Sequence, residues 1–190
     1  NTFEIPIGTW TAWTGSKYLA SQVKVTPEYI TNATSNWGAL RVRLPQMIDG
    51  DNFKVEFRAK NDPSLGGTWK WDLGFQVSND FSSGKLSAAG IETPTKYVSF
   101  TMTNGYYPDF FGIASDSGEI GRLNQSGAIN TRVWHNYVLI AKDHVLSLYS
   151  DGVLMYQQNY TGTVGMLDTF SIGGKNNLQL DAASLKFSQP

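Results

Sequence analysis

The sequence predicts an all-β fold, a jelly-roll sandwich of two antiparallel sheets. Many segments alternate between apolar and polar residues with a period of two, and tight turns rich in Asp and Gly separate them. No segment with helical periodicity is longer than about two turns; the best candidate, residues 18–25, is closed by Pro27. Short strands, frequent turns and no long helix together favour two stacked sheets.

Length and composition narrow the classes of protein. The chain has 190 residues, 41% hydrophobic and 13% aromatic, so one domain spanning residues 1–190 can bury a core. Only 16% of residues are charged and the net charge is −1, which argues against a nucleic-acid partner. No apolar run approaches the roughly 18 residues that span a bilayer, so membrane insertion is not expected. With no cysteine, neither disulfides nor thiol chemistry is available.

The predicted strands cover most of the chain. In order they are residues 37–44, 53–60, 69–78, 97–103, 110–114, 119–123, 137–141, 145–149, 153–157, 169–173 and 178–187. We expect Pro45 to end the first of these, and a bulge at Ala182-Ala183 to interrupt the last. Turns at residues 116–118, 142–144 and 151–152 predict three hairpins, and Asp151-Gly152 carries the strongest of these signals.

The last third of the chain carries a recognisable set of motifs. Trp134-His135 begins the apolar segment that ends at Ala141, a segment of the form Leu-x-Leu-Tyr-x-Asp-Gly covers residues 146–152, and Ile172-Gly173-Gly174 follows. This pattern resembles the laminin G-like/concanavalin A-like jelly-roll superfamily. The resemblance implies that Trp134 lies in the core and that His135 has a structural role. The superfamily includes lectins, carbohydrate-binding modules, glycosidases, lyases and protein-binding domains.

The resemblance also says where catalytic or metal-binding residues would lie. Glycosidases of the superfamily carry a Glu-x-Asp-x-x-Glu pattern on one strand, and the nearest analogue here, Lys70-Trp71-Asp72, supplies a single acid. The protein is therefore predicted not to be an enzyme. His135 and His144 are the only histidines, too few for a three-histidine zinc site. Calcium is a possible cofactor, since members of the superfamily bind it through oxygen ligands; the candidate ligands are Asp109, Asp116, Asp168, Asn176 and Asp181.

Aromatic residues next to polar ones suggest a sugar site. Aromatic rings stack on the apolar faces of sugars, while neighbouring polar groups bind the hydroxyls. The predicted platforms are Trp69, Tyr106, Tyr107 and Phe110, and the predicted hydrogen-bonding residues are Lys70, Asp72, Gln76 and Asp109. This site requires the polar face of strand 69–78, which includes Gln76 and Ser78, to be exposed to solvent. The alternative location is the set of loops around Trp10, Trp13 and Asn176-Asn177.

The sequence as a whole predicts a non-catalytic carbohydrate-binding module that mediates adhesion to a polysaccharide or cell-surface glycan. Because the chain does not begin with Met, we expect a module attached to other domains of a larger parent protein. That protein would be extracellular, on a cell surface or on a virion, where the module could recognise the host for a phage tail. Two alternatives stay open. One is a glycoside hydrolase or lyase whose acids converge from different strands, and the other is a structural or protein-interaction laminin G-like domain.

Overall fold

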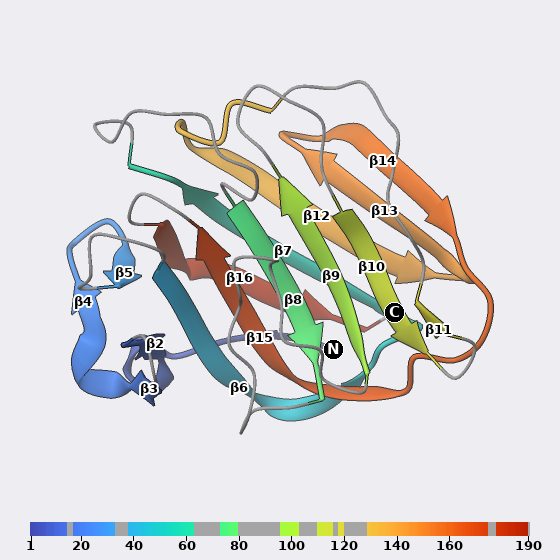
Figure 1. Ribbon diagram of the computed structural model, residues 1–190, viewed down its shortest axis with the longest axis horizontal. Helices are drawn as coiled ribbons and strands as arrows, with labels where there is room; N and C mark the ends of the chain where they lie inside the picture. Colours follow the sequence, from blue (N-terminus) through green and yellow to red (C-terminus); the bar gives the residue numbers. More distant parts are fainter. Residues whose placement is uncertain are drawn as a thin grey trace.

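The structure is a computed structural model that describes residues 1–14, 17–32, 38–62, 73–79, 96–102, 110–115, 118–119, 129–174 and 178–189. It consists of two antiparallel sheets packed face to face (Figure 1), which confirms the predicted sandwich. Sheet A contains, in spatial order, β14 (Val153–Asn159), β13 (Val145–Ser150), β12 (His135–Lys142), β7 (Phe53–Lys60), β16 (Gln179–Ser188), β5 (Ile30–Asn32) and β4 (Val23–Val25), and β1 (Thr2–Glu4) pairs with β16.

Sheet B lies against sheet A. Its strands are, in spatial order, β11 (Gly118–Glu119), β10 (Phe110–Ser115), β9 (Tyr97–Met102), β8 (Leu73–Ser78), β15 (Met166–Gly174), β6 (Gly38–Asp49), β2 (Thr11–Trp13) and β3 (Tyr18–Leu19). Two short 3-10 helices, η1 (Ile7–Thr9) and η2 (Ala20–Gln22), complete the assignment. In the part of the chain that the structure describes, no helix is long and apolar enough to cross a membrane.

Aromatic rings from both sheets meet at the centre of the core. Phe57 of β7 is 2% exposed, and its ring centroid lies 4.9 Å from that of Phe75 and 5.4 Å from that of Phe170, both in sheet B. Within sheet A the same ring contacts Tyr137 at 5.6 Å. Edge-to-face aromatic pairs at such distances stabilise a core beyond the area they bury. Phe57 therefore joins the two sheets directly.

Strand β6 is longer than the sequence predicts. The strand continues past Pro45 to Asp49, because its pairing with β15 is irregular at this point. Arg43 pairs with Thr169 and Ile48 with Leu167, so four residues of β6 lie opposite the single residue Asp168. Proline lacks an N–H for the ladder and is tolerated at such a bulge. The prediction that Pro45 ends the strand is wrong for this reason.

Residues 18–25 do not form the short helix that the sequence allowed. The segment contains β3, the single 3-10 turn η2 and β4, and none of the three residues of η2 is buried. Here β3 pairs with β2 at the edge of sheet B, and β4 pairs with β5 at the edge of sheet A. Pairing with strands distant in the sequence overrides the weak local helical pattern.

The β13–β14 hairpin is fixed by a histidine–aspartate contact. Asp151 (φ 51°) and Gly152 (φ 80°) form the predicted tight turn. The Asp151 carboxylate accepts hydrogen bonds from the backbone N–H of Asn136 (2.9 Å) and from His135 Nδ1 (2.6 Å). The other ring nitrogen of His135 lies 2.8 Å from the backbone carbonyl of Asn130. His135 thus connects two turns, which agrees with its predicted structural role.

A second carboxylate joins segments far apart in the sequence. Asp51 accepts hydrogen bonds from the Tyr160 hydroxyl (2.8 Å) and from the backbone N–H groups of Val164 (2.9 Å) and Gly165 (3.2 Å). Next to it, the Gly50 backbone N–H donates to the Gly165 carbonyl at 2.8 Å. A Cβ at Gly50 would lie 2.6 Å from a Val164 methyl carbon, so the approach of the two segments requires glycine.

We expect Phe57→Ala to lower the free energy of unfolding by about 3–5 kcal/mol, because it removes the ring that contacts both sheets. Urea unfolding followed by tryptophan fluorescence measures this change. The control is Val153→Ala, since Val153 is 61% exposed and its truncation should cost less than about 0.5 kcal/mol. Equal losses in the two variants would contradict the central position of Phe57.

We expect Asp151→Asn to lower the melting temperature at pH 5 more than at pH 2. The backbone hydrogen bond from Asn136 and the side-chain hydrogen bond from His135 hold the pKa of Asp151 below its ordinary value of 3.8. A carboxylate whose pKa is lowered on folding stabilises the protein above its unfolded-state pKa, and this contribution is lost as the pH falls through the folded-state pKa. Asparagine tolerates the positive φ of the turn.

Thermal unfolding of Asp143→Asn provides the matched control. Asp143 has nearly the same backbone conformation (φ 52°) in the β12–β13 turn, and within the described residues its carboxylate makes no hydrogen bond. Its melting temperature should follow that of the unmodified protein between pH 5 and pH 2. If the deficit of Asp151→Asn were the same at both pH values, the carboxylate would not be the stabilising group.

Candidate functional site

The structure describes only part of the predicted sugar site. Gln76 lies in β8 with its side chain described, whereas Phe110 begins β10 and only its backbone is described. Both Gly74 of β8 and Phe110 pair with Thr101 of the intervening strand β9, so the two segments are two strands apart in sheet B. The other predicted site residues lie outside the described residues, and their role stays a prediction: Trp69, Lys70, Asp72, Tyr106, Tyr107 and Asp109.

The expected exposure of the polar face of β8 is wrong. Gln76 is 4% exposed and Ser78 is 2% exposed, although both lie on the face of sheet B that points away from the core. Alternation places Phe75 and Val77 in the core and therefore turns Gln76 and Ser78 outward. Alternation identifies the face on which a side chain lies, but it does not say whether that face is open to water.

Gln76 belongs to a row of polar side chains across the outer face of sheet B. It pairs with Ser99 of β9 on one side and with Ser171 of β15 on the other. Ser171 in turn pairs with Arg41 of β6, and Arg41 pairs with Thr11 of β2. We call these five residues the polar row. Because directly paired residues share one face of a sheet, their side chains form one continuous line.

Aromatic side chains lie at one end of the polar row. The guanidinium carbon of Arg41 is 3.8 Å from the centre of the Tyr18 ring, and Trp13 lies 5.2 Å from Tyr18 at an interplanar angle of 59°. Trp13 and Tyr18 are partly exposed, whereas Arg41 is 6% exposed. Trp10, by contrast, is 2% exposed and packs its ring against Phe170 in the core. Of the two tryptophans in the alternative location, only Trp13 is therefore available at the surface.

Two adjacent strands of the polar row, β8 and β9, each carry a buried polar atom without a hydrogen-bond partner. The side-chain nitrogen of Gln76 and the hydroxyl oxygen of Ser99, which belong to paired residues of adjacent strands, are buried and unpaired. Buried polar groups in native proteins are nearly always hydrogen-bonded, and exceptions commonly mark a position taken by water or a ligand. An amide, hydroxyls and a guanidinium beside an aromatic ring can both donate to and accept from the hydroxyls of a sugar.

Most of the polar row could not be found from the sequence. Arg41, Ser171 and Ser99 lie on strands that the alternation does predict, but which strands pair depends on contacts distant in the sequence. The sequence predicts Tyr18 in a possible short helix and not in a site. A useful signal is that residues 39–43 and 169–173 both alternate apolar with polar side chains, as two neighbouring strands with one shared polar face would do.

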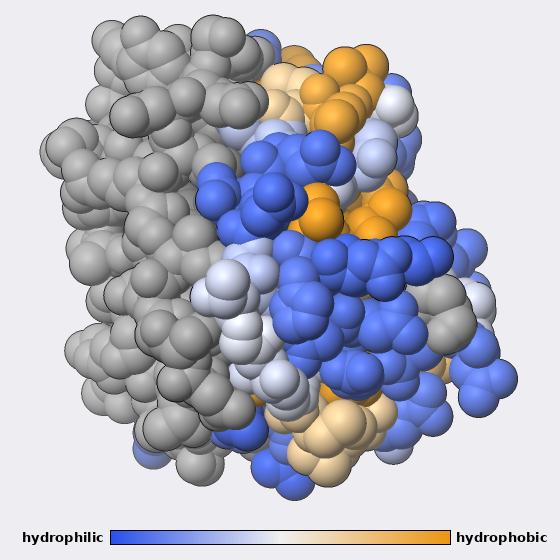
Figure 2. Space-filling view, turned by 90° about the vertical axis from the view of Figure 1, so that its right-hand side faces the viewer, coloured by the Kyte–Doolittle hydropathy of each residue, from blue (hydrophilic) through white to orange (hydrophobic). Residues whose placement is uncertain are grey.

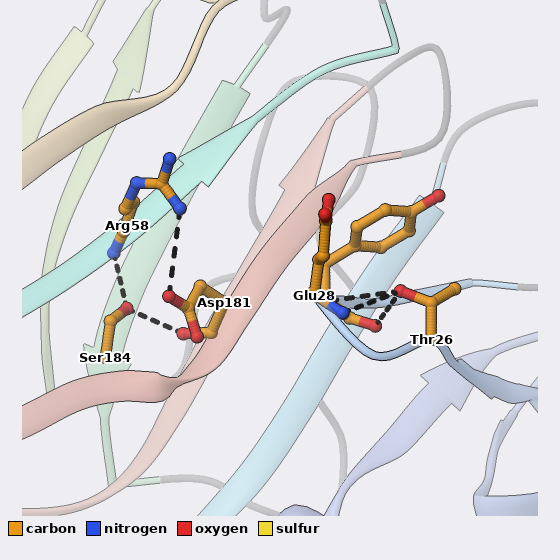
Figure 3. Close-up of polar contacts among 6 residues, drawn as sticks. Thr26, Glu28, Arg58, Asp181 and Ser184 are labelled. Carbon is orange, nitrogen blue, oxygen red and sulfur yellow. Dashed lines mark hydrogen bonds and ion pairs between the residues drawn. The ribbon is translucent and has the colours of Figure 1, made fainter.

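A second group of side chains gathers on the outer face of sheet A, around Trp134. This tryptophan precedes β12 and is partly exposed, so the prediction that it lies in the core is wrong. The guanidinium carbon of Arg58 lies 4.4 Å from the centre of the Trp134 ring, and the ring of Tyr29 lies 6.3 Å away. The Thr26 hydroxyl oxygen, 3.1 Å from the Tyr29 backbone nitrogen, helps to fix the turn before β5 (Figure 3).

The described candidates for calcium ligation do not come together. Asp168 accepts a hydrogen bond from the Thr169 hydroxyl at 2.8 Å in sheet B, whereas Asp181 faces Arg58 in sheet A. No group of three or more potential metal ligands of the His, Cys, Asp or Glu type occurs within the described ranges. Asp109, Asp116 and Asn176 lie outside those ranges, so calcium binding through them stays a prediction.

Several acidic residues have structural partners. Glu56 pairs with Lys54 at 3.0 Å, Asp151 binds His135, and Asp51 binds the segment around Val164. A retaining glycosidase needs two carboxyl groups about 5–5.5 Å apart, one of them able to hold a proton. The structure assigns these three acids to stabilising contacts and identifies no catalytic pair among them.

Comparison with known proteins identifies the fold. No family model matches the sequence, and no curated protein matches it. Among solved structures, the carbohydrate-binding module CBM66 from Bacillus subtilis superimposes with a TM-score of 0.60 at 10% identity, covering 95% of this chain and 96% of that one. The VIP36 exoplasmic/lumenal domain, in a form bound to Ca²⁺ and Man3GlcNAc, gives 0.60 at 11% identity over 100% and 88% of the two chains.

An enzyme shares the same architecture. The Bacillus licheniformis beta-glucanase superimposes with a TM-score of 0.59 at 10% identity over 98% of this chain and 95% of that one. At such low identity the likeness concerns the arrangement of strands and does not extend to substrate or activity. Together with the two sheets described above, these superpositions show that the chain has the concanavalin A-like jelly-roll fold of lectins and carbohydrate-binding modules.

Proposed function

We propose that this protein is a non-catalytic carbohydrate-binding module and that its glycan binds at the partly exposed end of the polar row of sheet B, over Trp13 and Tyr18. The observation that carries the proposal is this pair of partly exposed rings: Trp13 lies 5.2 Å from Tyr18, and the Arg41 guanidinium carbon lies 3.8 Å from the centre of the Tyr18 ring. Aromatic rings at a protein surface can stack on the apolar faces of sugars. The Thr11 side chain, which is also partly exposed, is paired with Arg41 and can bind a sugar hydroxyl.

The remaining residues of the polar row support this end of the sheet and do not themselves contact the glycan. Ser99, Gln76 and Ser171 are 0%, 4% and 5% exposed, so a ligand at the surface does not reach their side chains. The predicted site residues Tyr106 and Tyr107 lie outside the described residues, and their part in binding stays a prediction.

On the side that Figure 2 presents, the described residues do not form the extended apolar docking surface that a protein-interaction domain would need. Hydrophilic residues cover much of the described part of that side, and the hydrophobic areas are separated from one another. Val153 and Leu154 of edge strand β14 are exposed, but large protein interfaces require a broader continuous patch. This favours glycan binding over the protein-interaction alternative.

The proposal extends to the setting in which the module works. A single shallow sugar site binds weakly, and several copies on one particle raise the overall avidity. We infer a role in adhesion to a cell-surface polysaccharide, as one domain of an extracellular, cell-surface or phage tail protein.

We expect Trp13→Ala to weaken glycan binding about tenfold, since losing one stacking ring costs about 1–3 kcal/mol by analogy with base–aromatic stacking. The melting temperature should fall only slightly, because the ring is partly exposed and is not part of the core. A panel of neutral polysaccharides first identifies the tightest ligand, and isothermal titration then compares the variants against it.

The matched control is Tyr149→Ala on β13, a partly exposed aromatic residue of the other sheet. Its affinity should equal that of the unmodified protein. A lower melting temperature together with unchanged affinity in Trp13→Ala would show that the ring stabilises the fold and does not bind a glycan. Failure of every polysaccharide in the panel to bind the unmodified protein would contradict the proposed function.

A further inference from the structure

The outer face of sheet A carries an excess of positive charge. The outward positions of β7, β12 and β16 hold five basic side chains and two acidic ones: Lys54, Arg58, Lys60, Lys142 and Lys186 against Glu56 and Asp181. The chain as a whole has a net charge of −1, so this concentration is local. A cluster of cations on one face attracts anionic ligands.

Not all of these cations are neutralised by neighbours. Glu56 pairs with Lys54 at 3.0 Å, and Lys186 lies 3.8 Å from Glu4 of β1. Asp181 is 3.9 Å from one terminal nitrogen of Arg58, at the limit of an ion pair. Within the described residues Lys60 has no carboxylate at ion-pair distance; its ammonium lies 5.2 Å from the centre of the Trp134 ring. Arg58 and Lys60 therefore both lie near the Trp134 ring, and the one acid beside them, Asp181, is at the distance limit of an ion pair with Arg58.

Arg58 is held in a fixed orientation. Its guanidinium lies over the Trp134 ring at 4.4 Å, and its backbone N–H donates to the Ser184 hydroxyl at 2.7 Å. That hydroxyl donates in turn to the Asp181 carbonyl at 2.6 Å, where β16 is bulged. Figure 3 shows one terminal nitrogen of Arg58 directed at Asp181 and the other directed away from it. A guanidinium fixed in this way keeps donors free for a planar anion.

A surface depression lies beside Arg58. Asn136 of β12 is paired with Arg58, and it lines this depression together with Glu56, Phe57, Tyr137, Val138, Ser184 and Lys186. The polar lining is an amide, a hydroxyl, an ammonium and the Glu56 carboxylate, which Lys54 neutralises at 3.0 Å. Partly exposed aromatic rings lie nearby. These groups suit an anionic ring that also carries hydroxyls.

We propose that Arg58 and Lys60 form a second glycan site, which binds the anionic group of an acidic sugar unit. The anion is the carboxylate of a uronate or a sulfate ester, since both present oxygens to a guanidinium and an ammonium. This site is on the opposite sheet from the polar row and does not depend on it. Asn136 and Ser184 bind hydroxyls of the same sugar unit, a contact that a polymer held by charge alone would not make.

The test is isothermal titration with three probes: oligogalacturonate for the carboxylate, dextran sulfate for the sulfate and dextran as the neutral reference. We expect at least one anionic probe to bind and the neutral probe not to bind. Arg58→Gln and Lys60→Gln should each raise the Kd about tenfold. Arg58→Lys should fail to restore full affinity, because the charge remains but the planar fork is lost. The probe that binds identifies the anion.

Two controls separate the site from general charge effects. Lys142→Gln removes the same charge at the far end of β12, where the lysine is exposed, and should change the Kd less than twofold. Trp13→Ala, at the end of the polar row, should leave binding of the anionic probe unchanged, so failure of this site and failure of the proposed function can be told apart. Lys60→Gln provides a readout even if Arg58 variants unfold, since Lys60 makes no ion pair within the described residues.

Three results would overturn the proposal. The first is that neither anionic probe binds. The second is that Lys142→Gln weakens binding as much as Lys60→Gln does, which would indicate charge attraction over the whole face. The third is that dextran binds as tightly as the anionic probes and is weakened equally by Lys60→Gln, which would show that the site does not recognise the anion.

Discussion

The contact of Phe57 with rings from both sheets is the interaction on which the two outer faces depend. Side chains alternate along a strand, so burying Phe57 places Glu56 and Arg58 on the outer face of sheet A. Burying Phe75 and Phe170 places Gln76 and Ser171 on the outer face of sheet B in the same way. A slip of one residue in any of these strands would exchange core and surface, so a single packing arrangement fixes the core and both candidate sites.

The sequence predicts the fold well where the residues of one strand or turn determine its structure without a partner strand. The alternation in residues 53–60 gives β7 with its correct ends, and Asp151-Gly152 gives the hairpin turn. The errors arise where a partner strand decides the outcome. Pro45 is tolerated because β15 is irregular opposite it, and Gln76 is buried although its face points away from the core. Trp134 begins the expected segment, but Arg58 and Lys60 lie against its ring on the outer face.

The candidate sites show the same division. The alternation of the strand predicts the outward position of Gln76, whereas Ser99, Ser171 and Arg41 become its neighbours only through the order of strands in sheet B. The group around Trp134 also depends on pairing, because β7, β12 and β16 are distant in the sequence. The two outer faces differ in chemistry. Most side chains of the polar row on sheet B are uncharged hydrogen-bonding groups, whereas most charged side chains on the outer face of sheet A are basic. The fold can therefore present two kinds of ligand surface around one core.

The position of the chain ends has a mechanical consequence. Asn1 and Gln189 exchange backbone hydrogen bonds at 3.3 and 3.1 Å, and β1 pairs antiparallel with the end of β16, so the two ends leave the domain side by side (Figure 1). Tension applied between these ends acts across the β1–β16 pair and breaks its hydrogen bonds one after another. Shear along the strands would instead load all of these bonds together. Strand β1 should then peel away at low force while the Phe57 core stays intact, which would let a stretched tether lengthen by a few residues before the domain unfolds.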